Sequence, residues 1–350
     1  MLICFTLLSV MPATAAHGHG GGGEISVKSI VFDHIKDAYS WHITSWGKHH
    51  ISIPLPVILR GQNGEWEVFL SSKLEHSPTG NYKGFYISHS EGAYNGRIVE
   101  IDAQSGKEIR PLDFSLTKTA VGIWISALLL IILIMTCARW ARRNTGSAPK
   151  GFIGFMEMFI MDINDGLIKA CIGPKYSRYS PYLLTVFFFI FLNNILGLIP
   201  LFPGGVNVTG NITVTFFLAC CTFLMTNIFG SKEHFKEIFW PDVPHALKPI
   251  MIPIEIIGMF TKPFALMVRL FANIMAGHTI ILCLVSIIFV TATLGVVLFT
   301  SMTLVSVLFS LFMNALELLV AYIQAYVFTM LSAVFIGLSV QEHHKTQEQH

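Results

Sequence analysis

One arginine, Arg269, stands in a long apolar stretch of this 350-residue chain. Its guanidinium group does not lose its charge in proteins, and a charge at the centre of a bilayer costs at least ~2.5–3.5 kcal/mol. Ionisable residues in such places mark ion pathways and counter-ion sites. Arg269 is therefore the first candidate functional residue, and its permanent positive charge is the property that the chain would use.

Four other ionisable groups share the two long apolar segments that precede the polar C-terminal tail. They are Glu255, Lys262, His278 and Glu317. A buried carboxyl group beside a histidine can share a proton with it, because each group shifts the pKa of the other. Such pairs form proton relays in membranes. The candidates thus divide into a permanent cation and a pair of groups suited to proton exchange.

The two apolar segments, 249–290 and 294–340, are predicted to be two long helices that form a hairpin with its turn near 291–295. Facing residues of an antiparallel pair lie equally far from the turn. The midpoint in sequence between Arg269 and Gln324 is about residue 297, and so is the midpoint between His278 and Glu317. The pattern predicts that Arg269 lies near Gln324 and that His278 lies near Glu317. Each helix would be ~60–70 Å long, against a hydrocarbon core of ~30 Å, so a steep tilt is expected.

The positions of the polar residues around the first of these helices also matter. Asn273 lies one turn after Arg269 and is expected on the same face, and Glu255 lies on nearly the same face. His278 falls near the opposite face, so Arg269 and the histidine–glutamate pair are expected to serve different parts of one path. Because no carboxylate lies within one helical turn of Arg269, its counter-ion is expected to come from another chain.

The composition places these residues in a membrane protein. The chain is 53% hydrophobic and 13% charged, with a mean hydropathy of +0.61, which is too apolar for an ordinary soluble protein. The net charge of +2 gives no reason to expect a nucleic-acid partner. No HExxH, GxSxG or P-loop pattern indicates an enzyme. The cysteines have no metal or redox spacing, so we expect neither a metal nor a cofactor.

The N-terminal third is predicted to lie outside the cytoplasm. Residues 1–16 have an apolar run and an A-x-A site, which are typical of a signal peptide. Residues 17–116 form a predicted β-rich extension, and 117–138 the first transmembrane helix. Arg139, Arg142 and Arg143 follow at once, which places the end of that helix inside.

The extension has several runs with strand character, and Asn63-Gly64 between two of them is typical of a hairpin. These runs are 50–59, 66–71, 83–88 and 97–102.

After the first span, 151–172 is predicted to be an amphipathic helix at the cytoplasmic surface. Further transmembrane helices are expected at 182–201 and 213–229, before the tilted pair and a cytoplasmic C-terminus. The predicted fold is an all-α integral membrane protein with about five membrane-crossing helices and a small β-rich extracytoplasmic region.

Four motifs then carry a resemblance. KPFALMVRLFANIMAGH, NNILGLIP, GNITVT and AYIQAYVFTMLSAVF occur in one order and spacing. Together they resemble subunit a of the F-type ATP synthase, over about 149–342. The segment before Thr117 is not accounted for by these motifs and is similar to extensions in some bacterial members.

The resemblance implies a proton-translocating stator subunit that itself catalyses no reaction. Such a subunit provides two offset aqueous half-channels beside the c-ring, a rotating ring of small subunits that each bear one membrane carboxylate. It also implies the b-subunit peripheral stalk as a partner, membrane lipid around the helices, and the bacterial inner membrane as the location.

The resemblance assigns residues as well. Arg269 matches the family's essential arginine, and Gln324 matches the glutamine that faces it. Asn273 and Glu255 match polar positions that line the pathways, and Asn194 matches a position in or near the outside half-channel. At His278 and Glu317 the histidine and the glutamate are exchanged relative to many bacterial members. That exchange agrees with a close pair.

Two other functions stay open from the residues themselves. One is a stand-alone ion channel or secondary transporter in which Arg269 binds an anion, although no inverted repeat is visible. The other is a membrane-bound enzyme. The histidine–glutamate pair favours a proton over sodium as the coupling ion.

Overall fold

The computed structural model describes residues 38–46, 49–62, 64–75, 81–88, 94, 96–102, 106–144, 148–199, 205–240, 244, 247–291 and 296–340. The chain divides into two compact units, which we describe separately. The first unit takes in residues 1–125, 199–206 and 279–313, and the second takes in 126–198, 207–278 and 314–350. The predicted signal peptide at 1–16 lies outside the described residues, as do most of the expected hairpin turn and the C-terminal tail.

The first unit contains three small antiparallel sheets. One pairs β1 (Ser40–Trp46) with β2 (His49–Pro54). The second has the order β4-β3-β9, with β3 at Pro56–Arg60, β4 at Trp66–Leu70 and β9 at Leu112–Asp113. The third has the order β5-β6-β7-β8, at Asn81–Tyr82, Phe85–Ile87, Ile98–Ile101 and Glu108–Ile109. A short helix, α3 (Ser72–Glu75), follows β4.

The core of this strand region is apolar. Its central hairpin was predicted from the sequence. Strands β3 and β4 pair from Pro56↔Leu70 to Arg60↔Trp66, and Gly64 in the connection has a φ of 78°, which glycine adopts without strain. The predicted single run at 50–59 is divided at Leu55 into β2 and β3. The buried side chains that pack together are Tyr39, Val57, Leu59, Phe69, Leu74, Phe85 and Ile98.

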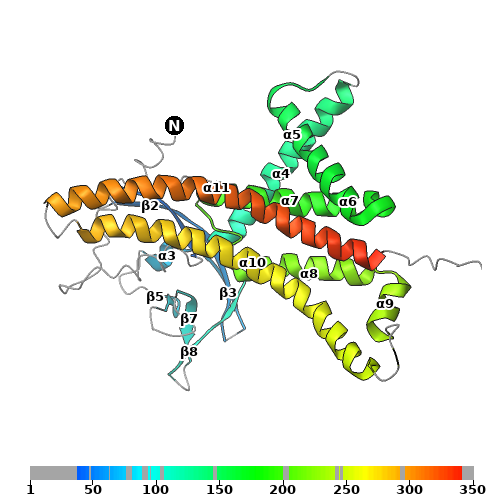
Figure 1. Cartoon of the computed structure of the whole chain (residues 1–350). Helices are drawn as coiled ribbons and strands as arrows, with labels where there is room; N and C mark the ends of the chain where they lie inside the picture. Colours follow the sequence, from blue (N-terminus) through cyan, green and yellow to red (C-terminus); the bar gives the residue numbers. More distant parts are fainter. Residues whose placement is uncertain are drawn as a thin grey trace, which may run out of the picture. The chain divides into compact units, whose positions relative to one another are not determined.

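Most of the described residues after the strand region are helical (Figure 1). Helix α4 (Lys118–Arg143) extends the predicted first span through the arginine cluster. A broken helical segment follows α4. After that segment come α7 (Tyr176–Leu198), α8 (Ile212–Ile228) and α9 (Lys232–Phe239). Helices α10 (Lys248–Thr291) and α11 (Val296–Val340) are the two longest. Pro253 and Pro263 both lie inside α10, which remains one helix.

The predicted amphipathic segment 151–172 is helical but not regular. It consists of α5 (Gly151–Met161), a π-helical stretch at Asp162–Ile168 and α6 (Lys169–Ile172), followed by a 3₁₀ turn at Gly173–Lys175. In the π-helical stretch Ile163, Leu167 and Ile168 are buried, whereas Asp162 and Asp165 are exposed. The π-helical stretch therefore has the two-sided character that the sequence predicts, whereas α5 exposes the apolar side chains of Phe152, Phe155 and Met158.

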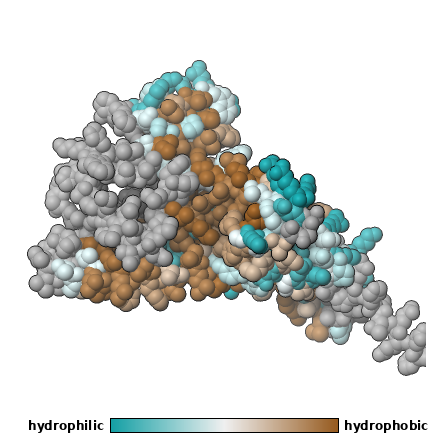
Figure 2. Space-filling view, turned by 90° about the horizontal axis from the view of Figure 1, so that it is seen from above, coloured by the Kyte–Doolittle hydropathy of each residue, from teal (hydrophilic) through white to brown (hydrophobic). Residues whose placement is uncertain are grey.

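The helices have the length and composition of a multi-pass membrane protein. In the part of the chain that the structure describes, four helical stretches are long and apolar enough to cross a membrane, and α8 is a shorter apolar helix. These four are 118–143, 151–198, 248–288 and 300–340. Hydrophobic residues cover a broad part of the face seen in Figure 2, as expected for helices whose solvent is lipid. The predicted steep tilt of α10 and α11 stays a prediction.

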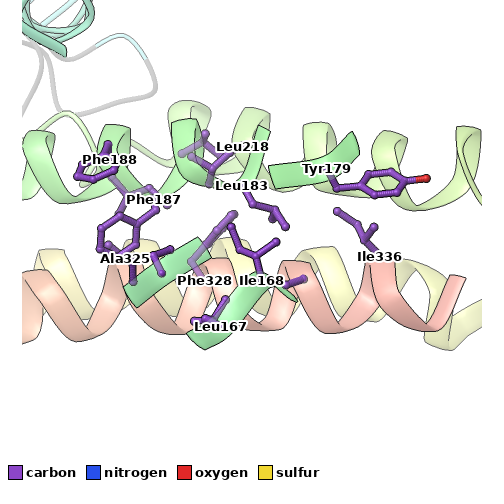
Figure 3. Packing of buried hydrophobic residues seen from close by; sticks show 14 of the residues in the cluster. Leu167, Ile168, Tyr179, Leu183, Phe187, Phe188, Leu218, Ala325, Phe328 and Ile336 are labelled. Carbon is purple, nitrogen blue, oxygen red and sulfur yellow. The ribbon is translucent and has the colours of Figure 1, made fainter. Parts of the chain in front are cut away.

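The second unit is held together by aromatic and aliphatic side chains between α7 and α11 (Figure 3). Phe187 and Leu183 of α7 point toward Ala325 and Phe328 of α11, and each of these four side chains is almost fully buried. The ring of Tyr322 lies 6.3 Å from that of Phe187. This packing fixes the part of α11 that carries the polar residues Glu317 and Gln324.

Candidate functional site

Arg269 lies on an outward face of α10. Its side chain is exposed, as are those of Phe264 and Val268, whereas Leu266 and Leu270 are buried. The only ion pair between described residues joins Lys83 and Glu67, in the strand region. Arg269 therefore has no carboxylate partner within the described part of the chain. The charged guanidinium group of Arg269 thus lies at the surface of an apolar helix.

One turn after Arg269, α10 is joined to α11 by a hydrogen bond. The side-chain nitrogen Nδ2 of Asn273 donates to Oε1 of Gln324 over 2.7 Å. Gln324 is only 3% exposed, and its Nε2 is buried and has no hydrogen-bond partner among the described residues. The structure thus brings Gln324 against Asn273, one turn from Arg269. It gives no direct bond between Gln324 and the guanidinium.

The pairing of α10 with α11 follows the predicted antiparallel register, and Figure 1 shows the two helices side by side. Asn273 contacts Gln324, and a Cβ atom on Gly277 would lie 3.2 Å from Oε1 of Glu317. The midpoints in sequence of these two residue pairs fall at about residues 297 to 299. This close approach leaves little room for a side chain at 277, because a Cβ atom there would press on the Glu317 carboxyl group.

His278 and Glu317 meet at one small cavity in the second unit. The cavity measures about 10 Å³, which is about the space that one water molecule needs. The sequence-predicted Asn194 is at the same cavity. The lining residues are Asn194, Gly197, Leu198, Asn207, Ile274, His278, Glu317 and Ala321.

The Glu317 carboxyl group is the most unusual part of this cavity. The residue is 8% exposed, and its Oε2 atom is buried without a hydrogen-bond partner among the described residues. A buried polar atom left unpaired costs about 1–3 kcal/mol. Such an atom calls for an explanation, such as a bound water or a proton-transfer role. The cavity beside it provides room for a single water.

Asn194 is held in place from two sides. Its Nδ2 donates to the backbone oxygen of Ala321 over 3.3 Å, and its Oδ1 accepts a hydrogen bond of 2.6 Å from Oγ1 of Thr209. Asn194 is therefore a rigid polar wall of the cavity. The position of Thr209 was not foreseen from the sequence, because it depends on how the loop before α8 folds back.

Asn207 is a cavity residue that the sequence reasoning missed. Its Oδ1 accepts a bond of 2.8 Å from the backbone nitrogen of Gly210, whereas its Nδ2 is buried and unpaired among the described residues. A Cβ atom at Gly210 would lie 2.3 Å from this side chain. The signal in the sequence was the Asn207–Gly210 spacing, in which only glycine leaves room for the amide.

Glu255, the remaining predicted site residue, lies apart. It is half-buried on α10, fourteen residues before Arg269, and it does not line the cavity. The structure therefore separates the candidates into three places along the helices: Glu255, the Arg269–Asn273–Gln324 group, and the cavity. Among the described residues, no group of three or more His, Cys, Asp or Glu side chains is arranged to hold a metal ion.

Comparison with known protein families decides what this arrangement belongs to. A family model described as "ATP synthase A chain" matches residues 121–337, which is more than half of the chain and includes all of these side chains. The chain belongs to the ATP synthase subunit a family. A second family model, described as a domain of unknown function (DUF8433), matches 30–114. The strand region is therefore distinct from the part that defines subunit a.

Individual relatives agree with the family model. The chain is 45% identical over 242 residues to "ATP synthase subunit a" of Chlorobium phaeobacteroides strain DSM 266, covering 67% of this chain and 68% of the relative. It is 39% identical over 300 residues to "ATP synthase subunit a" of Myxococcus xanthus, covering 82% and 92%. Chlorobium phaeobacteroides strain BS1 has a relative of the same description that is 35% identical over 340 residues, covering 95% and 82%.

Proposed function

We propose that this subunit a is the proton-translocating stator of an F-type ATP synthase, and that it provides two half-channels and the charge that couples proton flow to rotation of the c-ring. Its membership of the family supports the coarse role. The observation that carries the residue-level proposal is the exposed guanidinium of Arg269, which has no carboxylate partner within the described part of its own chain. Its counter-ion is then a carboxylate of the c-ring.

The role of Arg269 follows from electrostatics. A ring carboxylate that has lost its proton is drawn to the guanidinium, because both charges sit where the surroundings are apolar. A ring carboxyl group that holds a proton is neutral and moves into lipid at a much lower cost. The arginine thereby separates the site where a proton leaves the ring from the site where one joins it, and it blocks direct proton flow between them.

The cavity supplies the entry side of this path. A proton from outside passes between the imidazole of His278 and the carboxyl group of Glu317 and then neutralises a ring carboxylate. Asn194 and Asn207 hold water against the unpaired Oε2 of Glu317. The Asn273–Gln324 pair lies between the cavity and Arg269 along α10 and α11, and it positions polar groups beside the arginine. Glu255 lines one of the two pathways, as the resemblance to the family implies.

The remaining assignments rest on charge distribution and on the family. The cluster of Arg139, Arg142 and Arg143 at the end of α4 supports a cytoplasmic position for that end. The strand region and the C-terminus then lie on opposite sides of a bacterial inner membrane. The subunit is non-catalytic, and the b-subunit peripheral stalk holds it against rotation. Each proton that crosses a potential of 100 mV contributes about 2.3 kcal/mol.

The test is an Arg269→Ala variant in the intact complex. ATP-driven acidification of sealed membrane vesicles should fall to background, although the complex assembles. Lys262→Ala is the matched control, because it removes a positive charge from an exposed position on the same helix. That variant should retain most of the acidification. Acidification by the Arg269→Ala complex would instead favour a structural or anion-binding role for this arginine.

A further inference from the structure

The strand region carries an apolar face that its own core does not use. Side chains on β4 alternate, so that Phe69 is buried in the core while Trp66, Val68 and Leu70 point the other way. These three are 56%, 66% and 47% exposed. Each lies opposite a β3 residue on the same side of the sheet, in the pairs Arg60↔Trp66, Ile58↔Val68 and Pro56↔Leu70.

The third strand of this sheet extends the same face. Leu112 of β9 pairs with Arg60, and Phe114 donates its backbone N–H to the carbonyl of Ile58 over 3.0 Å. Leu112 and Phe114 are 59% and 62% exposed, and the rings of Phe114 and Trp66 lie 5.7 Å apart. We call this surface the outer apolar face: Trp66, Val68, Leu70, Leu112 and Phe114.

Such a face is unexpected on a small sheet that meets water. An antiparallel sheet with one face on a core normally has polar residues on the other, and contiguous apolar patches mark interaction sites. The one charged side chain paired into this face is Arg60, whose guanidinium lies 5.9 Å from the centre of the Trp66 ring. Tryptophan with a neighbouring arginine is the composition found where a protein meets the headgroup level of a bilayer.

Backbone hydrogen bonds tie this face to a membrane-spanning helix. After Phe114 the chain continues along β3, where Leu116 donates to the carbonyl of Pro56 over 3.1 Å. Lys118, the first residue of α4, donates to the carbonyl of Ala38 over 2.9 Å. Phe114 is four residues before that helix, so it lies within about 14 Å of the helix start. The sheet is therefore joined to the start of α4 without a free linker.

From these observations we infer that the outer apolar face lies on the interfacial zone of the lipid bilayer, with its side chains among the headgroups and upper acyl chains. The strand region is then an interfacial anchor that sets how α4 enters the membrane. Lipid is the occupant because the face is continuous, through hydrogen-bonded backbone, with a helix that spans the bilayer. This inference does not depend on the proton-transfer role proposed for the helical part.

The test places a nitroxide label on the face in the whole complex. In a background with all native cysteines replaced, Val68→Cys is labelled and the complex is put into nanodiscs of phosphatidylcholine and phosphatidylglycerol. Collisions of the label with oxygen, which concentrates in lipid, and with a water-soluble nickel chelate are then compared. The Val68 label should have a several-fold higher ratio of oxygen to nickel accessibility than a label at Ile101→Cys, an exposed residue of β7 in the four-stranded sheet.

Each outcome decides the inference. A label at Val68 that is as open to the nickel chelate as the Ile101 label would show a water-facing surface, and shielding from both reagents would show that protein covers the face, whether another subunit, a second copy or the N-terminal segment. Either result overturns the inference. A second label at Leu112→Cys guards against local disruption by the first, and it should give the same high ratio of oxygen to nickel accessibility.

Discussion

The strand region and the helical part differ in the buried polar atoms that they leave unpaired. In the strand region the Tyr39 hydroxyl donates to Asp113 over 2.5 Å, and the Ser88 hydroxyl donates to Glu108 over 2.9 Å. Among the described residues, every buried side-chain atom without a hydrogen-bond partner lies from Asn193 onward. These atoms include Oε2 of Glu317 and Nε2 of Gln324.

This difference points to some of the unpaired groups as candidates for a functional role. A paired polar group contributes to stability or is close to neutral, whereas an unpaired buried one costs about 1–3 kcal/mol. Three of the unpaired atoms belong to Asn207, Glu317 and Gln324, at or near the cavity. The helical part thus bears a cost at the positions that the proposed proton path uses. Substitutions in the two regions should therefore change different measured quantities.

Among these substitutions, Glu317→Gln is expected to have the largest effect on passive proton flux. This change keeps the size and shape of the side chain but removes the group that gains and loses a proton. Passive proton flux through the membrane sector, driven by a potassium diffusion potential after removal of the soluble part, should fall by at least about tenfold, since proton transfer by a positioned group contributes factors of that order or more.

Asn227→Leu is the control for Glu317→Gln. Asn227 also has a buried, unpaired oxygen, but it does not line the cavity. Its substitution should leave the flux close to that of the unmodified complex. If the Glu317→Gln complex conducts protons as the unmodified one does, an unpaired buried atom is no guide to function in this protein.

A smaller effect is expected from Gly277→Ala. The added methyl group would lie 3.2 Å from Oε1 and 3.4 Å from Cδ of Glu317, so the carboxyl group must shift by a few tenths of an ångström. Proton flux should fall by a factor of about 2 to 10, because small displacements of reacting groups reduce rates strongly. Gly258→Ala on the same helix has nothing within 4 Å of the added atom and should conduct normally. Equal flux in both variants would count against a positioned carboxyl group.

The smallest effect on proton flux is expected in the strand region. Burial, followed by the hydrogen bond to Asp113, raises the pKa of Tyr39 from 10.0 to about 12. Tyr39→Phe should lower the local stability of the sheet by about 1 kcal/mol, seen as faster amide hydrogen exchange in β3 and β9, while proton flux stays unchanged. Altered flux in this variant would break the separation between the two regions.

The raised pKa also gives the stability of the sheet a pH dependence. The neutral hydroxyl is favoured in the folded state, so its contribution is complete below pH 10, the unfolded pKa. It is lost as the pH rises from 10 toward 12. Hydrogen exchange in the unmodified complex should accelerate over that range, and the Tyr39→Phe complex should lack this component.

The two longest helices could be predicted from the sequence to within a few residues, whereas α7 begins at Tyr176 instead of the predicted 182 and α9 was not predicted. The predicted 249–290 and 294–340 correspond to Lys248–Thr291 and Val296–Val340, because long apolar runs leave little freedom about where a helix lies. The short strands β5, β8 and β9 were missed. Each has only two residues, and its pairing is set by distant partners rather than by local propensity.

The site shows the same division between local and distant information. Facing residues of two antiparallel helices lie equally far from the turn that joins them. This rule sufficed to predict that His278 and Glu317 lie close together, since the turn fixes how far one helix is shifted along the other. Asn207 and Thr209 could not be predicted, because they reach the cavity through a loop whose path depends on Asn194 and Gly210. The bond between Asn273 and Gln324 shows that register gives the neighbourhood of a residue, while rotamers decide which atoms meet.

The most direct test of the central claim is ATP-driven acidification by the Arg269→Ala complex, measured together with its assembly on a native gel. The claim is that the positive charge on α10 is completed by a carboxylate on another chain and couples proton flow to rotation. The account predicts an assembled complex that hydrolyses ATP but acidifies no vesicles, while Lys262→Ala still pumps. An assembled Arg269→Ala complex that acidifies vesicles at a rate near that of the unmodified enzyme would contradict it.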